Sequence, residues 1–170
     1  YDVARLDGGL TARAARDGLG VFLLGAKPGV GARAAEVLTA ENPGLKIVGV
    51  LSPPLGFEKD TQQNADVVRA IRDAKPALVL VALGAPKQEL WMHAQRDVLA
   101  PSVLLGIGGT LDFLAGTVKR APRWMSENGL EWLYRLAQEP ARMAGRYLVR
   151  DRAFVGIALR SLVDARRESR

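Results

Sequence analysis

The stretch ALVLVALGAPKQELW, residues 77–91, decides the fold of this chain. Its first seven residues are all apolar, as in a strand that is covered on both faces of a sheet. Gly84 and Pro86 then favour a turn into a helix that begins near Lys87. A strand, a short turn and a helix form the unit from which parallel sheets are built, so this stretch predicts an α/β protein.

The same unit recurs along the first two thirds of the chain. Apolar runs bounded by glycine or proline predict further strands at residues 21–24, 47–51 and 103–107. Apolar spacing and helix breakers predict helices at residues 31–40, 61–74 and 87–96, with a loop at 53–56. Short links between these elements favour right-handed crossovers, and hence a Rossmann-like parallel sheet flanked by helices.

Composition excludes several function classes. With 170 residues, 48% of them hydrophobic, the chain can bury one compact core. It has no cysteine, which excludes disulfides and thiolate metal sites. His93 is the only histidine and lies beside Trp91, which favours an ordinary residue on a helix face over a triad or a zinc site. No apolar run approaches the ~20 residues of a membrane-spanning helix, so we expect a soluble or peripheral intracellular protein.

The positive charge lies at one end of the chain. Residues 1–116 hold 12 Lys and Arg against 12 Asp and Glu, whereas residues 117–170 hold 12 against 6 and carry the whole net charge of +6. We therefore predict an α/β core at residues 1–116 and a basic helical appendage at residues 117–170. Arginines beside Trp and Tyr suit an anionic membrane surface or a pyrophosphate, and a nucleic-acid surface or a solvated helix face would use the same residues. The sequence opens at Tyr1 without Met, and we expect further residues upstream.

The turn after the first strand, residues 25–31, reads GAKPGVG. Its backbone N–H groups and the positive end of the next helix suit a phosphate, and Lys27 adds a charge. The pattern is neither GxxxxGK[ST] nor GxGxxG, and a plain strand-to-helix turn explains it equally well. Gly25 and Lys27 are therefore candidates for a phosphate site.

Two later turns indicate a ligand site more strongly. In GAPKQ, residues 84–88, small residues let the backbone approach a ligand, and Gln88 offers a donor and an acceptor. In GIGGTLD, residues 106–112, glycines permit a sharp turn, and the Asp112 carboxylate can accept from a ribose hydroxyl or a base N–H. The alternative is two ordinary helix starts, with Glu89 and Asp112 facing the helix dipole. If the two strands are neighbours, Gln88 and Asp112 line the same sheet edge.

Several segments, taken in order, resemble the WecG/TagA/CpsF glycosyltransferase family. They are LGAPKQELW (83–91), GGTLDFLAG (108–116), KRAPRWM (119–125), GLEWLYR (129–135) and QEP (138–140), so the resemblance covers roughly residues 21–148. It implies inverting transfer of an N-acetylmannosamine-type sugar from a UDP donor to a polyprenyl-pyrophosphate-linked acceptor. Such enzymes build wall teichoic acid, enterobacterial common antigen, capsule or exopolysaccharide, as peripheral proteins on the cytoplasmic face of the bacterial cell membrane.

The resemblance also implies roles for particular residues. Asp112 would contact the nucleotide and Gln88 the sugar or phosphates, and we take Gln88 and Arg5 as catalytic candidates. The other donor-binding candidates are Gly84, Ala85, Pro86, Lys87, Gly108 and Gly109. The arginines Arg135, Arg142 and Arg146 would meet the acceptor pyrophosphate or the membrane. The family's presumed base is an aspartate upstream of the first matched strand, a position that precedes this sequence.

The expected partners follow from the same resemblance, and the rival functions from the residues. We expect no metal or other cofactor, with the UDP-sugar as substrate, the lipid-linked acceptor and an anionic membrane surface as partners, and no nucleic acid. Apolar helix faces in the appendage favour a homo-oligomer. A non-catalytic nucleotide-binding or membrane-surface module is the alternative. A nicotinamide-dependent oxidoreductase is more distant, because no GxGxxG with an acid ending the second strand is present.

Overall fold

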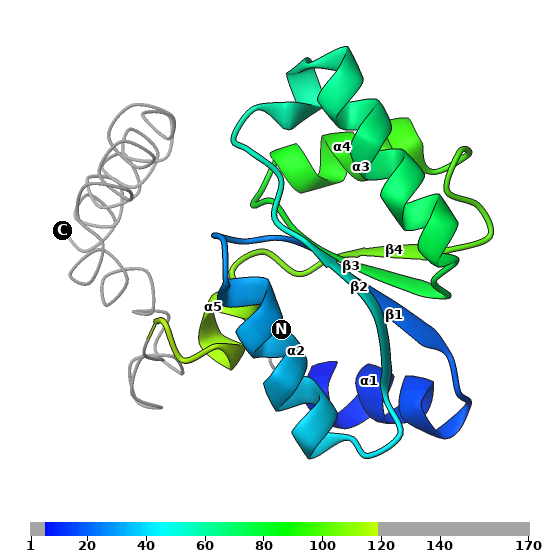
Figure 1. Cartoon of the computed structure of the whole chain (residues 1–170), viewed down its shortest axis with the longest axis vertical. Coiled ribbons are helices and arrows are strands. Elements are labelled where there is room, and N and C mark those ends of the chain that lie inside the picture. Colours follow the sequence, from blue (N-terminus) through cyan, green and yellow to red (C-terminus); the bar gives the residue numbers. More distant parts are fainter. Residues whose placement is uncertain (1–5, 119–170) are drawn as a thin grey trace, which may run out of the picture. The chain divides into compact units, whose positions relative to one another are not determined.

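Four parallel strands form the centre of the fold in a computed structural model, which describes residues 6–118. They are β1 (Gly20–Gly25), β2 (Lys46–Leu51), β3 (Leu78–Ala82) and β4 (Val103–Gly106). Their order across the sheet is β2-β1-β3-β4, with all three pairings parallel (Figure 1). The predicted parallel sheet is confirmed, and every predicted strand is present with ends that differ by at most one residue.

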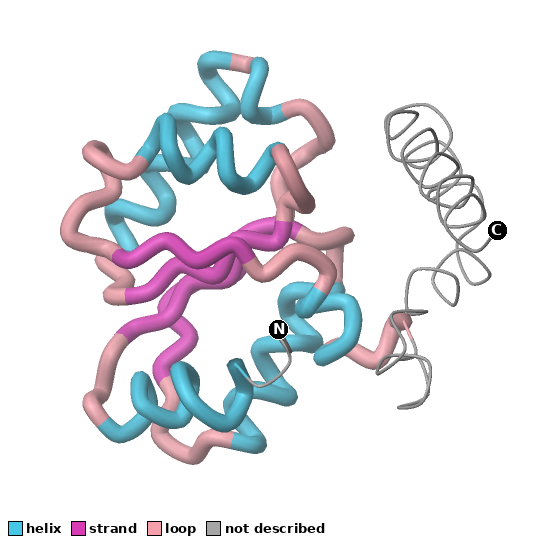
Figure 2. The backbone as a smooth tube through the Cα atoms, turned by 180° about the vertical axis from the view of Figure 1, so that it is seen from behind, coloured by secondary structure: helices cyan, strands magenta, loops and turns pink. Residues whose placement is uncertain are grey.

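Helices cover both faces of this sheet. α1 (Leu6–Arg16), α2 (Val30–Glu41) and α5 (Thr110–Leu114) lie on one face, and α3 (Thr61–Ala74) and α4 (Lys87–Gln95) lie on the other (Figures 1 and 2). The three helices predicted within residues 31–96 are confirmed, α3 with the predicted bounds. The short 3-10 helix η2 (Phe57–Lys59), which follows the expected loop, was not predicted. It forms where Phe57, only 1% exposed, joins the core beneath α3 and α4.

Alternate residues of the central strands fill two separate cores. Val21 and Leu23 of β1 pack with small side chains of α2 such as Ala34, whereas Phe22 and Leu24 pack under Ile71 of α3. All of β3 is buried, as its unbroken apolar sequence predicts for a strand covered on both faces. Both faces of the sheet are therefore packed against helices, and this packing fixes the positions of the strand ends.

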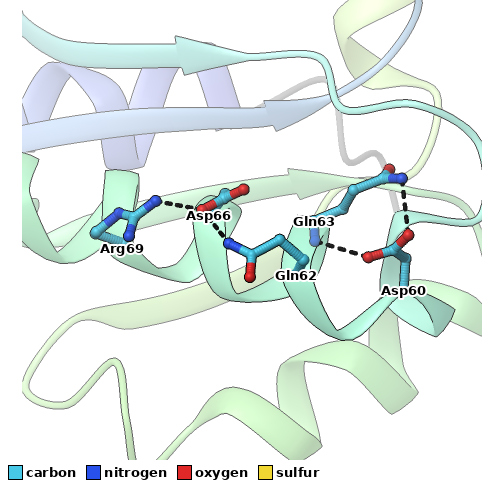
Figure 3. A network of polar contacts seen from close by, with 5 residues as sticks. All are labelled: Asp60, Gln62, Gln63, Asp66 and Arg69. Atoms are coloured by element: carbon cyan, nitrogen blue, oxygen red, sulfur yellow. Dashed lines mark hydrogen bonds and ion pairs between the residues drawn. The ribbon is translucent and has the colours of Figure 1, made fainter.

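The start of α3 is set by side-chain hydrogen bonds. Asp60 is the N-cap: its carboxylate accepts from the Gln63 backbone N–H at 2.9 Å and from Gln63 Nε2 at 3.0 Å (Figure 3). One turn further, Asp66 accepts from Gln62 Nε2 at 3.1 Å and pairs with Arg69. These bonds are on the exposed side of α3, so they stabilise the helix end without joining a site.

Candidate functional site

Three glycine-bearing turns meet at the carboxyl edge of the sheet. The β1–α2 turn (residues 26–29), the β3–α4 turn (83–86) and the β4–α5 turn (107–109) follow neighbouring strands. The first two are joined where Ala26 N–H donates to the Ala82 carbonyl at 3.2 Å, and the last two where Ile107 N–H donates to the Val81 carbonyl at 2.9 Å. Because β3 and β4 are neighbours, Gln88 and Asp112 share one edge, as the sequence predicts for that case.

The β1–α2 turn owes its shape to backbone geometry. Gly25 has φ +107°, and a Cβ there would lie 2.4 Å from the Ala82 carbonyl oxygen, so only glycine fits. Ala26 follows in the left-handed region with φ 61°, an uncommon conformation for a residue with a side chain. Ser52, at the end of β2, donates from Oγ to the Gly25 carbonyl at 3.1 Å and approaches the Lys27 carbonyl at 3.4 Å. Sequence analysis missed Ser52, although its place directly after a predicted strand marks it as an edge residue.

The β3–α4 turn exposes backbone and carries charge. Gly84 has φ +78° with open space around its missing Cβ, and Ala85 and Pro86 are exposed, so a ligand has access to this backbone. Lys87 Nζ pairs with Glu58 Oε2 of η2 at 3.7 Å. The charge predicted to meet a donor phosphate is therefore already matched by a carboxylate. Glu58 was also missed, since nothing in the local pattern links η2 to the helix start at Lys87.

Gln88 turns inward. It is 6% exposed, its Oε1 accepts from the Gly108 backbone N–H at 3.0 Å, and its Nε2 donates to Glu89 Oε1 at 2.9 Å. A Cβ on Gly106 would lie 2.7 Å from Gln88 Nε2, so the absence of a side chain at 106 makes room for this amide. Gln88, which the sequence predicts as a ligand contact, thus connects the start of α4 to the β4–α5 turn by a hydrogen bond.

Asp112 lies in the first turn of α5 and is partly buried. Its backbone carbonyl accepts from Thr117 N–H at 3.0 Å and from Thr117 Oγ1 at 2.9 Å. Within residues 6–118 the structure gives its carboxylate no hydrogen-bond or ion-pair partner. The carboxylate therefore keeps its capacity to accept hydrogen bonds.

A shallow groove lies beside these turns, between the end of β2 and α3. Two of its polar members already have partners: Gln63 bonds to Asp60, the N-cap of α3, and Asp66 bonds to Gln62 and Arg69 (Figure 3). The rest of the lining is apolar except for Ser52. The groove is lined by Leu51, Ser52, Pro53, Pro54, Gln63, Asp66, Val67 and Ala70. None of these residues belongs to the three turns, although Ser52 bonds to the first of them.

The remaining predicted site residues lie outside the described part of the chain. These are Arg5 and the appendage arginines Arg135, Arg142 and Arg146. Within the described part, no three His, Cys, Asp or Glu side chains are grouped so that they can hold a metal ion. No helix among these residues has both the length and the apolar character needed to cross a membrane.

The fold and this edge define a Rossmann-like α/β protein, a class that binds its ligands at the carboxyl ends of its strands. The chain belongs to the Glycosyl transferase WecG/TagA/CpsF family, since the model of that family matches residues 5–168. The predicted family resemblance is confirmed.

A curated relative gives the comparison more detail. The N-acetylglucosaminyldiphosphoundecaprenol N-acetyl-beta-D-mannosaminyltransferase of Bacillus spizizenii is 39% identical to this chain over 122 residues. The match covers 72% of this chain and 45% of the relative, so the chain spans about half the length of that relative.

Proposed function

We propose that this chain carries the donor-binding part of an inverting glycosyltransferase. Its substrates are a UDP-linked N-acetylmannosamine-type sugar and an acceptor linked to polyprenyl diphosphate. The family match over residues 5–168 carries the proposal, and the name of the Bacillus relative supports the sugar and the acceptor class. The meeting of three turns at one sheet edge supports a single donor site there.

The donor diphosphate would lie over the β1–α2 and β3–α4 turns. α2 and α4 both begin at this edge, and helix N-termini favour anions. Gly25, Gly84 and Gly108 have positive φ angles, and they shape the backbone that would face the ligand. The carboxylate oxygens of Asp112, which have no partner among residues 6–118, would take hydrogen bonds from the ribose or the uracil.

The reaction is a single displacement. The acceptor hydroxyl oxygen attacks the anomeric carbon, a glycosidic C–O bond forms, and the bond from that carbon to the UDP oxygen breaks. UDP leaves with the electron pair, and the hydroxyl proton passes to a base. Positive charge from Lys27, Arg5 and the appendage arginines would stabilise the departing diphosphate. The base would come from outside the described residues.

Titration of the chain with UDP, UMP and NADH by calorimetry tests the donor site. We expect UDP to bind more tightly than UMP because the β-phosphate adds contacts to the turns, and NADH to bind weakly. Asp112→Asn should reduce UDP affinity about tenfold, the effect of a lost charge-assisted hydrogen bond, and should alter the chemical step less. Asp97→Asn, an exposed residue after α4, is the matched control and should leave the affinity unchanged. Unchanged affinity in Asp112→Asn would contradict the role given to this carboxylate.

Two further measurements test the acceptor side. A chain that carries the catalytic base should continue to transfer the sugar to a lipid-linked acceptor in the presence of a chelator, because we propose a reaction without a bound metal. Cosedimentation with anionic vesicles should weaken when Arg135, Arg142 and Arg146 are replaced together, if the appendage holds the protein on the inner face of the membrane. UDP binding without any transfer by a chain that includes the upstream aspartate would favour the non-catalytic module instead.

A further inference from the structure

We propose that Gln88 is a positioning residue, whose buried amide fixes the β4–α5 turn against the start of α4 so that the donor site keeps its shape. The inference rests on the proposed donor site and assigns this residue a role other than ligand contact. It concerns the hydrogen bond that connects the start of α4, after the β3–α4 turn, to the β4–α5 turn.

The hydrogen bonds of the amide are the first observation. Gln88 Oε1 accepts from Gly108 N–H at 3.0 Å, across 20 residues of sequence, and Nε2 donates to Glu89 Oε1 at 2.9 Å. Gln88 is 6% exposed, so its amide is largely shielded from water, and losing a partner costs more there than at the surface. Each end of the amide thus already has a partner in the protein.

The space around the amide is the second observation. Gly106 ends β4, and a Cβ there would lie 2.7 Å from Gln88 Nε2 and 3.1 Å from Met92 Cε. A side chain at 106 would therefore displace the amide from its observed position, whereas the backbone of Gly106 does not itself call for glycine, since its φ is not among the positive ones. The amide holds the turn at Gly108, which has φ +54°. The backbone alone does not fix this turn, because glycine can adopt many other φ angles.

The consequence for the site follows from the order of the chain. Gly108 and Gly109 lead directly into α5, and Asp112 lies in the first turn of that helix. A turn released from Gln88 would let Asp112 shift relative to the β3–α4 turn. Gln88 would then influence nucleotide binding through Gly108 and not by touching the nucleotide.

A double-mutant cycle tests this role. Gln88→Ala removes the bridge, and Gly106→Ala leaves Gln88 in place but pushes its amide away from Gly108. Each should speed hydrogen exchange of the Gly108 amide at least about tenfold without ligand, and each should lower UDP affinity about fivefold to tenfold. The double variant should be no worse than Gln88→Ala alone, because the new methyl group at 106 then meets no amide, and its other neighbour, Met92 Cε at 3.1 Å, is the flexible end of a side chain. Gln95→Ala, at the end of the same helix, is the matched control and should change neither quantity.

The two readouts separate the outcomes. Lost UDP affinity with unchanged Gly108 exchange would overturn the inference and make Gln88 a direct ligand contact. Additive losses in the double variant would overturn it as well. If the unaltered chain binds no UDP, the proposed function fails, whereas exchange at Gly108 still decides whether Gln88 holds the turn. Should Gln88→Ala not fold, Gly106→Ala and its exchange rate provide the same test.

Discussion

The β1–α2 turn and the β3–α4 turn lie side by side at one sheet edge, yet they keep their shapes by different means. The first depends on backbone: Gly25 has φ +107° and touches the neighbouring strand where a Cβ would clash. The second is tied to other segments by side chains, since Lys87 pairs with Glu58 and Gln88 bonds to Gly108. The structure therefore predicts opposite sensitivities to substitution in the two turns.

This difference bears on the proposed function. A turn shaped by its backbone can present N–H groups to a phosphate without using any side chain. A turn tied by side chains couples its position to η2 and to the β4–α5 turn, and so links the diphosphate end of the site to the Asp112 end. Substitutions that affect only the turn shaped by its backbone, or only the turn tied by side chains, test this difference directly.

The largest effect is expected for Gly25→Ala. The new Cβ would lie 2.4 Å from a backbone carbonyl that belongs to β3 and has little room to move. We expect a loss of about 3–5 kcal/mol in the free energy of unfolding, from the contact and the φ angle together. Denaturant unfolding followed by circular dichroism measures it.

Gly29→Ala in the same turn is the control. Gly29 has φ +83°, but a Cβ at this position would meet nothing within 4 Å, so only the conformational cost of about 1 kcal/mol applies. Equal losses in the two variants would show that the contact with Ala82 does not decide the shape of this turn.

A smaller effect is expected for Lys87→Ala. Glu58 is 18% exposed and its Oε2 has no hydrogen-bond partner within the described part of the chain, so Lys87 supplies the compensating charge. Removing it should cost about 1–2 kcal/mol of stability, because a largely buried carboxylate is left unpaired. Adding Glu58→Gln should restore at least half of the loss in denaturant unfolding. Lys59→Ala, an exposed neighbour, should have little effect. If Glu58→Gln restores nothing, the pair is not what joins η2 to α4.

The two turns also differ in how far the sequence predicts them. Glycines and apolar runs locate both turns, and a parallel sheet places them at one edge, so the edge was predicted, whereas the strand order was left open. The inward amide of Gln88 was not, because its partner Gly108 is 20 residues away and the bond depends on β3 and β4 being neighbours. Ser52 and Glu58 were missed for the same reason: each acts on a turn that belongs to another segment.

The smallest effect is expected for Ser52→Ala, and it separates stability from binding. Ser52 Oγ donates to the Gly25 carbonyl at 3.1 Å on the carboxyl side of the sheet, whereas Ser102 Oγ donates to the Pro76 carbonyl at 2.6 Å on the amino side. Each serine thus joins neighbouring segments by one hydrogen bond, and each alanine variant should lose about 0.5–1.5 kcal/mol of stability. Only Ser52→Ala should also weaken UDP binding in calorimetry, by about twofold to threefold, because only Ser52 supports a turn of the proposed site. An equal loss of UDP affinity in Ser102→Ala would mean that binding follows general stability and not the shape of the β1–α2 turn.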